Sequence, residues 1–337
     1  MEQRTLHSDV KNLNIPHLDT IGRGITSLAH EAPERFQAVL RAGRQHYGQA
    51  AMAIGNAISR RWLTRNCNPY LSEINDLAAL ADRPGLHLLN MSYEWSCTTS
   101  VAPDPAGEGS RLLRTLDWPL EGLGRDVVVA RMAGPAGEYE NVTWPGFTGI
   151  ATAMAPGRFA AAINQPPMRK WTQSYHLDWF INRQHLWRSR ALPPVHLMRR
   201  VFDNCRTYAD AKEALIRTPL SMPAFFTLVG NDANEGCVIE RTETNSVVRK
   251  SPASVSNHWV GDTHYGYHRG IDSESRYAQM EAVLEELVHD KPFQWVMPPI
   301  LNATTRLAVI ATPMSGRLIV QGWEREEPVV KLFDLEG

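Results

Sequence analysis

The residues Tyr93-Glu94-Trp95-Ser96-Cys97-Thr98-Thr99-Ser100-Val101-Ala102 are followed after a turn by Arg114-Thr115-Leu116-Asp117-Trp118. Both segments have strand-like composition, and the Pro, Gly and Asp residues between them are typical of a turn. A hairpin would therefore fold Arg114 and Asp117 back beside the sulfur of Cys97. A fixed cation beside a thiol favours the thiolate, so this arrangement is suited to a nucleophile.

The first ninety residues are expected to be mainly helical. Apolar side chains recur at spacings of three, four and seven over residues 34–63, which predicts one amphipathic helix. A second helix is predicted over residues 71–81, where Arg83-Pro84-Gly85 stops it. Residues 86–91 form a short apolar run, which we interpret as the first strand.

The rest of the chain alternates between strand-like and helical blocks. Helices are predicted within residues 175–217 and around 275–289. Strands are predicted at 98–102, 111–116, 127–132, 142–154, 159–164, 224–229, 236–240, 246–249, 307–311 and 318–323. This order predicts an α+β fold, a four-layer αββα sandwich in which helical layers enclose two antiparallel sheets.

Composition and net charge restrict the classes of protein to which the chain can belong. The 337 residues contain 43% hydrophobic and 21% charged residues and no long linker, which is typical of one large domain or two closely packed pieces. The net charge of -1 offers no broad surface for nucleic acid or an anionic membrane. The polar amino terminus and the lack of a long apolar run predict a cytoplasmic protein with no integral membrane segment. Oligomeric state is left open, with a homo-oligomer among the alternatives.

The base that would activate Cys97 has two candidate sources. No histidine is near Cys97 in sequence, although His258 or His264 could fold in. If the bond between Ser96 and Cys97 were cut, the new α-amino group, with a pKa of about 7.7–8.0, would be a base on the nucleophile itself. The chain would then be a precursor with a mainly helical pro-segment at 1–96 and a catalytic domain at 97–337.

Other site types find less support in the sequence. No P-loop, G-x-G-x-x-G, H-E-x-x-H or G-x-S-x-G motif is present. The spacing of His258, His264 and His268 fits no standard metal site, so neither a metal nor a cofactor is expected. Met168 and the tryptophans at 171, 179 and 187 are candidates either for an acyl-chain pocket or for core packing.

The segment around Cys97 resembles a known family. Tyr93 to Ala102 followed by Arg114-x-x-Asp117-Trp118 is similar to the acid ceramidase and N-acylethanolamine acid amidase branch of the cholylglycine hydrolase-like amide hydrolases. Further similarity lies at Leu228 to Asn231, Glu235 to Arg241, Val255 to Trp259 and Asp272 to Arg276. The resemblance implies an N-terminal-nucleophile hydrolase that matures by self-cleavage before its cysteine.

The resemblance also implies roles for individual residues. Cys97 would be the nucleophile, and Asp117 would hold its freed amine. Arg114 would lie beside the sulfur and the substrate carbonyl. Asn257, and also Asn164, would donate hydrogen bonds to the oxyanion. Arg276 would orient the segment that carries Asn257 or the acidic members of the site.

The leading hypothesis is a cysteine amidohydrolase that cleaves a small, linear, non-peptide acyl amide through a thioester. Acyl transfer to an amine acceptor is a variant that needs only a different second substrate. The other alternative is an uncleaved, non-catalytic relative that binds a lipid or a partner. It is motivated by an extra residue in the hairpin at 104–110, by Thr115 in place of the family asparagine, and by Gln165 in place of its glutamate.

Overall fold

The computed structural model of the protein describes residues 13–107, 109–261, 264, 266–285 and 291–336. Its larger sheet is almost wholly antiparallel, with a parallel pairing only between β1 and β4. In order across the sheet, its strands are β1 (His17–Asp19), β4 (Val128–Gly134), β5 (Gly137–Thr143), β6 (Thr152–Ala155), β7 (Phe159–Asn164), β9 (Ala224–Val229), β10 (Gly236–Arg241) and β11 (Ser246–Lys250).

The second sheet contains the hairpin predicted around the cysteine. Its strands, in order, are β12 (Ala253–Val255), β2 (Ser96–Pro103), β3 (Ser110–Asp117), β14 (Thr305–Thr312), β15 (Arg317–Glu324) and β16 (Glu327–Pro328), while β17 (Phe333–Leu335) pairs with β15. A separate two-stranded sheet joins β8 (Met168–Arg169) to β13 (Gly266–Tyr267). Within the hairpin, Ser96 is opposite Asp117, Cys97 is opposite Leu116, and Thr99 is opposite Arg114.

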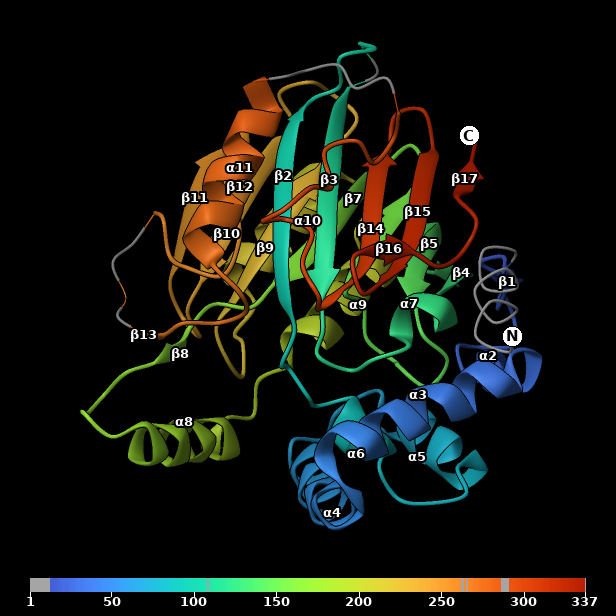
Figure 1. Ribbon diagram of the computed structural model, residues 1–337, viewed down its shortest axis with the longest axis vertical. Coiled ribbons are helices and arrows are strands. Elements are labelled where there is room, and N and C mark those ends of the chain that lie inside the picture. Colours follow the sequence, from blue (N-terminus) through green and yellow to red (C-terminus); the bar gives the residue numbers. More distant parts are fainter. Residues whose placement is uncertain (1–12, 108, 262–263, 265, 286–290, 337) are drawn as a thin grey trace, which may run out of the picture.

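The two large sheets pack face to face, and helices cover their outer faces (Figure 1). On one side, α9 (Pro194–Asn204) and α10 (Tyr208–Arg217) lie against the larger sheet. On the other side, α11 (Ser273–Glu285) lies against β2 and β12, and α7 (Leu123–Asp126) lies against β14 and β15. The predicted α+β fold with αββα layers is confirmed.

The remaining helices lie at one end of the sandwich (Figure 1). They are α2 (Ser27–Glu31), α3 (Pro33–Tyr47), α4 (Gln49–Arg65), α5 (Leu71–Leu80), α6 (Leu86–Leu89) and α8 (Tyr175–Arg188). In the described part of the chain, none of the helices combines the length and the apolar character needed to cross a bilayer.

Three predicted boundaries are wrong. The single helix expected over 34–63 is two helices, because Gly48 with φ 80° turns the chain between α3 and α4. The strand expected at 86–91 is the helix α6, since a short apolar run rich in leucine can equally be a buried helical turn. The strand expected over 142–154 is the end of β5, a buried connection, and then β6.

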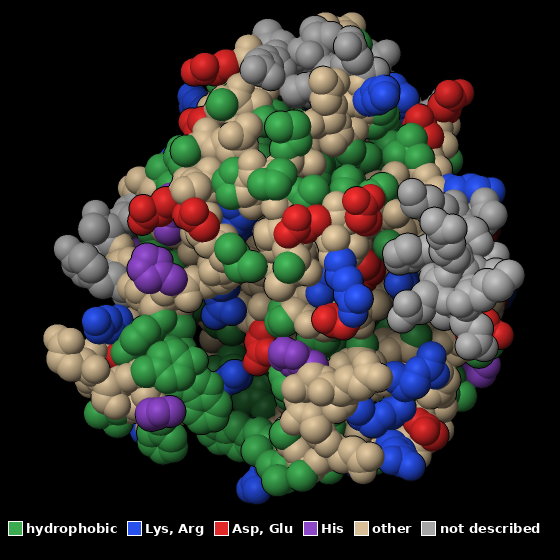
Figure 2. Space-filling view, viewed as in Figure 1, with side chains coloured by type: hydrophobic (Ala, Val, Ile, Leu, Met, Phe, Trp, Pro, Cys, Tyr) green, Lys and Arg blue, Asp and Glu red, His purple; other side chains and the backbone are tan. Residues whose placement is uncertain are grey.

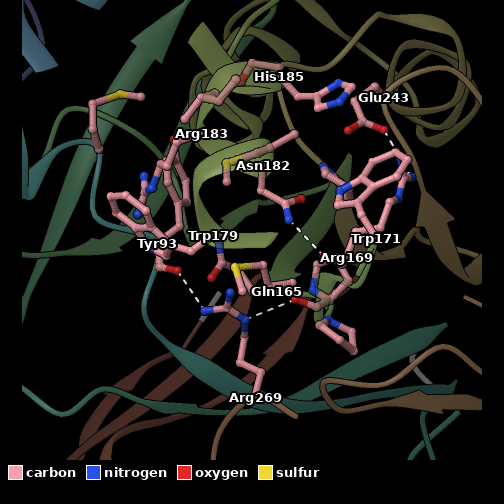
Figure 3. Close-up of a pocket in the computed structure, with 18 residues that line it drawn as sticks. Tyr93, Gln165, Arg169, Trp171, Trp179, Asn182, Arg183, His185, Glu243 and Arg269 are labelled. Carbon is pink, nitrogen blue, oxygen red and sulfur yellow. Dashed lines mark hydrogen bonds and ion pairs between the residues drawn. The ribbon is translucent and has the colours of Figure 1, made fainter. Parts of the chain in front are cut away.

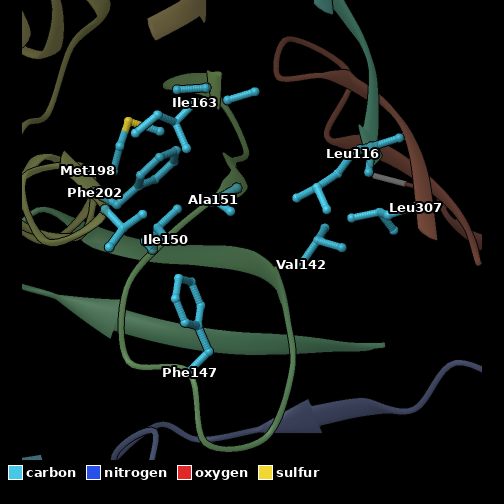
Figure 4. Close-up of a cluster of buried hydrophobic side chains, with 14 of the residues drawn as sticks. Leu116, Val142, Phe147, Ile150, Ala151, Ile163, Met198, Phe202 and Leu307 are labelled. Carbon is cyan, nitrogen blue, oxygen red and sulfur yellow. The ribbon is translucent and has the colours of Figure 1, made fainter. Parts of the chain in front are cut away.

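The hydrophobic core occupies two interfaces between layers (Figure 4). Met198 and Phe202 of α9 lie near Ile150 and Ile163, which fills the space between this helix and the larger sheet. Leu116 and Leu307 of the second sheet lie near Val142 of the first. All of these side chains are 1% exposed or less, so both faces of the larger sheet are buried there.

An ion pair between a buried arginine and a partly exposed glutamate joins the helical amino-terminal part to the sandwich. The Arg199 guanidinium of α9 forms two hydrogen bonds to the Glu73 carboxylate of α5, one of them 2.9 Å from Nη2 to Oε1. It also donates to the carbonyl of Thr148 and lies over the ring of Tyr70. Residues on both sides of Cys97 are therefore joined by a contact that does not depend on the peptide bond between Ser96 and Cys97.

Replacing Glu73 with glutamine should lower the free energy of unfolding by about 2 kcal/mol, because the buried Arg199 charge would lose the nearer of its two carboxylates and keep only Asp203 at 3.9 Å. Equilibrium urea denaturation measures this change. The matched control is Glu213→Gln, which removes an exposed i,i+4 pair with Arg217 and should leave stability unchanged. Equal losses in the two variants would contradict a special role for the Arg199 pair.

Candidate active site

Cys97 is the second residue of β2 and is completely buried. Its Sγ atom is 3.1 Å from Nη2 of Arg114 and 3.7 Å from the carbonyl oxygen of Ile163 at the end of β7. The thiol therefore faces the space between the two sheets, because Ile163 belongs to the first sheet and Cys97 to the second.

Arg114 holds its position beside the sulfur through the facing sheet. Its Nη1 donates to the carbonyl of Ala151 at 2.6 Å, and the side chain is completely buried. Burial raises the pKa of the Cys97 thiol to about 11, while the charge of Arg114 acts in the opposite direction. In the intact chain the thiol is thus protonated near neutral pH, with a cation in place to stabilise the thiolate once it forms.

Asp117 lies on the other face of the hairpin. Residues three apart in a strand point to opposite faces, so Arg114 points between the sheets while Asp117 points toward α11. Its carboxylate is 3.7 Å from Nη1 of Arg276 and accepts hydrogen bonds from Asn302 and Thr305. Burial raises the pKa of Asp117, and these three partners oppose that rise.

Asn257 and Arg276 fix the backbone of the cysteine. The side-chain oxygen of Asn257 accepts the Cys97 N–H at 2.9 Å and also a hydrogen bond from Arg276. Arg276 Nη1 donates to the Cys97 carbonyl at 2.7 Å and to the hydroxyl of Thr98. Both sides of the Cys97 backbone are therefore held, and the nitrogen that cleavage would free already has an acceptor.

Asn164 is joined to this group one step further from the sulfur. Its side-chain oxygen accepts a hydrogen bond from Thr99 at 2.7 Å, and its nitrogen donates to the carbonyls of Val255 and Ser256. The Asn257 nitrogen likewise donates to a carbonyl, that of Gln165, at 2.7 Å. The structure thus brings all six predicted residues together, while the oxyanion role of the two asparagines stays a prediction.

The histidines considered as an alternative base have contacts with other residues in the described parts of the chain. His258 Nδ1 lies 2.8 Å from the hydroxyl of Ser273, and the His264 ring packs edge-on against Trp259. Among the residues that the structure describes, no group of three or more His, Cys, Asp or Glu side chains is placed to hold a metal ion.

A cavity of about 110 Å³ is lined by residues of the segments before Cys97 and after Asn164, among them Tyr93 and Gln165 (Figure 3). Met168, Trp171 and Trp179 are among its lining residues, together with Gln165, the neighbour of Asn164. Trp187 instead lines a second hollow of about 290 Å³ between α4 and α8. Of the four side chains considered for an acyl pocket, each therefore borders a cavity.

Several residues of the site were not predicted from the sequence. Asn302 and Thr305 hold Asp117 from the start of β14, where polar residues before a strand look like an ordinary turn. Thr99 fixes Asn164, and the Ile163 carbonyl contacts the sulfur. The alternation of β2 could have identified Thr99, because it shares a face with Cys97; nothing in the sequence marks a backbone carbonyl.

Comparison with known proteins identifies relatives of this chain. No protein-family model matches the chain. Acid ceramidase of Pan troglodytes is 27% identical over 220 residues, which cover 58% of this chain and 53% of that protein. N-acylethanolamine-hydrolyzing acid amidase of Oryctolagus cuniculus is 26% identical over 245 residues, which cover 66% of this chain and 64% of that protein. The chain spans about half the length of the acid ceramidase that it matches.

A solved structure agrees with the fold. The Caenorhabditis elegans ortholog of N-acylethanolamine-hydrolyzing acid amidase superposes with a TM-score of 0.51 at 20% identity, covering 65% of this chain and 93% of that one. The resemblance predicted from the residues around Cys97 is thereby confirmed: the chain is similar in sequence to acid ceramidases and N-acylethanolamine-hydrolyzing acid amidases, and similar in fold to one of the latter.

Proposed function

We propose that the protein is a cysteine N-terminal-nucleophile hydrolase of small, linear acyl amides that matures by cutting its own chain before Cys97. The observation that carries the proposal is the pair of contacts at this one residue. Its sulfur lies 3.1 Å from a buried guanidinium, and its backbone nitrogen donates at 2.9 Å to a side-chain oxygen. The sulfur that would act as the nucleophile and the nitrogen that would become the free amine therefore have separate partners.

The self-cleavage step uses the thiol that the structure shows. The Cys97 sulfur attacks the Ser96 carbonyl carbon, the peptide C–N bond breaks, and the thiol proton passes to the departing nitrogen. The product is a thioester between Ser96 and the sulfur, together with a free α-amino group on Cys97. Water then hydrolyses the thioester and releases a carboxylate at Ser96.

The freed amine would serve in the catalytic cycle as the base. With an ordinary α-amino pKa of about 7.7–8.0 it can accept the thiol proton near neutrality. The thiolate attacks the carbonyl of the acyl amide, the amine product leaves with that proton, and water hydrolyses the acyl thioester. Asn257 remains the hydrogen-bond acceptor for the amine. Asp117 supplies a negative charge on the face of the hairpin that is opposite to the Cys97 sulfur.

The relatives support an acyl amide as substrate. Their names describe ceramidases and amidases that hydrolyse N-acylethanolamines. Because this chain spans only part of those proteins, hydrolysis, the identity of the nucleophile and the boundary between residues 1–96 and 97–337 remain parts of the proposal. A cytoplasmic location also remains a prediction.

A non-catalytic relative is the second candidate, and one observation favours it. In the undivided chain the thiol is completely buried and burial raises its pKa to about 11, so a chain that is never cut would present no exposed thiolate to an external substrate. The second candidate therefore differs from the first in whether the bond before Cys97 is cut.

An acyl-transfer probe separates the two candidates. The parent protein incubated with an activated acyl ester should gain one acyl group, detected as a mass shift on the fragment that starts at Cys97, because the thioester is the proposed intermediate. Cys97→Ala should gain none, whereas Cys67→Ala, which removes an exposed thiol, should be labelled like the parent. Equal labelling of the parent and Cys97→Ala would exclude a special role for this thiol.

The pH dependence of maturation follows from the buried thiol. Because the Cys97 pKa is raised to about 11, the thiolate fraction grows by about tenfold per pH unit below that value. The rate at which freshly purified chain converts to fragments should therefore rise between pH 6 and pH 9, as measured by gel densitometry. A rate that is highest at acid pH would mean that another group, rather than thiol ionisation, controls the step.

A further inference from the structure

Cationic side chains outnumber acidic ones around the cavity that Tyr93 and Gln165 help to line (Figure 3). Arg169, Arg183 and Arg269 line it, with Glu243 as the acidic lining residue. Glu243 is matched by Arg169 at 3.4 Å. Arg183 and Arg269 form no ion pair with any residue in the described parts of the chain, although Glu94 attracts both at longer range.

Arg269 is held by neutral partners. Its Nε donates to the carbonyl of Pro166 at 3.0 Å and its Nη1 donates to the carbonyl of Tyr93 at 2.9 Å. Burial lowers the pKa of Arg269 to about 10, which still leaves it charged near neutral pH. A charged guanidinium in a cavity wall without a carboxylate partner is suited to an anionic ligand, because charge-assisted hydrogen bonds to carboxylates are the strong ones.

A second polar group at this cavity lacks a partner. Gln165 is 3% exposed, and within the described residues its side-chain oxygen has no hydrogen-bond partner. A buried acceptor left unpaired costs free energy, so a ligand that offers an N–H there would be favoured. The same cavity is therefore bordered by arginines that could bind an anion and by a glutamine oxygen that could accept a hydrogen bond from an N–H group.

These groups lie next to the nucleophile. Gly270 packs against Ser96 so closely that a side chain at position 270 would collide with it. The Gln165 carbonyl accepts a hydrogen bond from Asn257, which in turn holds the Cys97 nitrogen. The charge of Arg269 also interacts with that of a Cys97 thiolate, so an anion bound by Arg269 would lie near the nucleophile.

Room for an apolar chain is present beside the cationic groups. The hollow of about 290 Å³ between α4 and α8 is lined by Ile58, Trp62, Leu88 and Trp187 among others. Met91, Arg183 and Leu186 border both this hollow and the cavity that contains the cationic groups. Figure 2 shows a recess at this place, with hydrophobic side chains gathered beside it over α8.

We propose that the preferred substrates are N-acyl α-amino acids, in which a carboxylate lies two bonds from the scissile nitrogen. The carboxylate would bind Arg269 and Arg183, the amide N–H would donate to Gln165, and the acyl chain would lie in the hollow between α4 and α8. This inference rests on the proposed function, because it assigns the substrate class of the same site.

The test compares two ligands that differ at one group. N-decanoylglycine and N-decanoylethanolamine share the acyl chain and the amide, and only the first carries a carboxylate. Their binding to the full-length Cys97→Ala variant is measured by isothermal titration calorimetry, since that variant cannot turn either ligand over through the thiol. Because hydrogen bonds between charged groups are about twice as strong as those between neutral groups, N-decanoylglycine should bind at least about tenfold more tightly.

Variants of the lining residues identify the side chains that produce the preference for the carboxylate ligand. Arg183→Gln, also made in the Cys97→Ala background, should lose most of the preference, and Gln165→Glu should reverse it, because a new negative charge would repel the carboxylate. Arg188→Gln is the matched control, since this exposed arginine ends α8 and lines neither of the two hollows. Thermal unfolding of each variant verifies that it is folded.

Each outcome decides the proposal. Equal binding of the two ligands, no binding of either, or a preference that survives in folded Arg183→Gln protein would overturn it. The result is separate from the proposed hydrolase activity, because binding is measured without turnover. If the parent protein is never acylated but the carboxylate ligand still binds more tightly, the proposed hydrolase activity is refuted. The proposed carboxylate-binding site then still stands.

Discussion

The thiol of Cys97 is completely buried, and a buried group that must ionise pays a desolvation cost unless an opposite charge lies beside it. Arg114 supplies that charge at 3.1 Å. The guanidinium is itself buried, so it needs fixed partners, and the Ala151 carbonyl of the facing sheet is one of them. The pairing of the two sheets and the reactivity of the cysteine are therefore parts of one arrangement.

The other members of the site follow from the geometry of a strand. Alternation directs the Cys97 side chain between the sheets and leaves its backbone accessible from the side of α11. Asn257 and Arg276 use that access to hold the nitrogen and the carbonyl. The layers of the sandwich thus separate the two chemical tasks, with the cation for the sulfur on one face and the groups for the amine on the other.

Much of this could be predicted from the sequence because its signals are local. The β-branched run at Cys97 and the turn before Arg114 predicted the hairpin, and the six candidate residues do lie in one network. Leu86–Leu89 was mistaken for a strand because a short apolar run has no period that separates it from a buried helix. Asn302 and Arg269 reach the site only through the packing of distant segments, which no local pattern shows.

The helical segment before Cys97 contributes to the protein beyond the peptide bond that joins it. The Glu73 and Arg199 pair holds it to α9, and its residues form one wall of the hollow beside α8. Cutting the chain before Cys97 would therefore free an amine without removing this contact or this wall. Maturation and retention of the segment are compatible in this structure.

The most direct measurement is the intact mass of the purified protein, for the parent and for Cys97→Ala. We expect two fragments from the parent, residues 1–96 and 97–337, with a free cysteine amine at the start of the second, and a single undivided chain from the variant. An undivided parent chain that hydrolyses acyl amides would contradict this expectation, because the amine on which the mechanism depends would not exist.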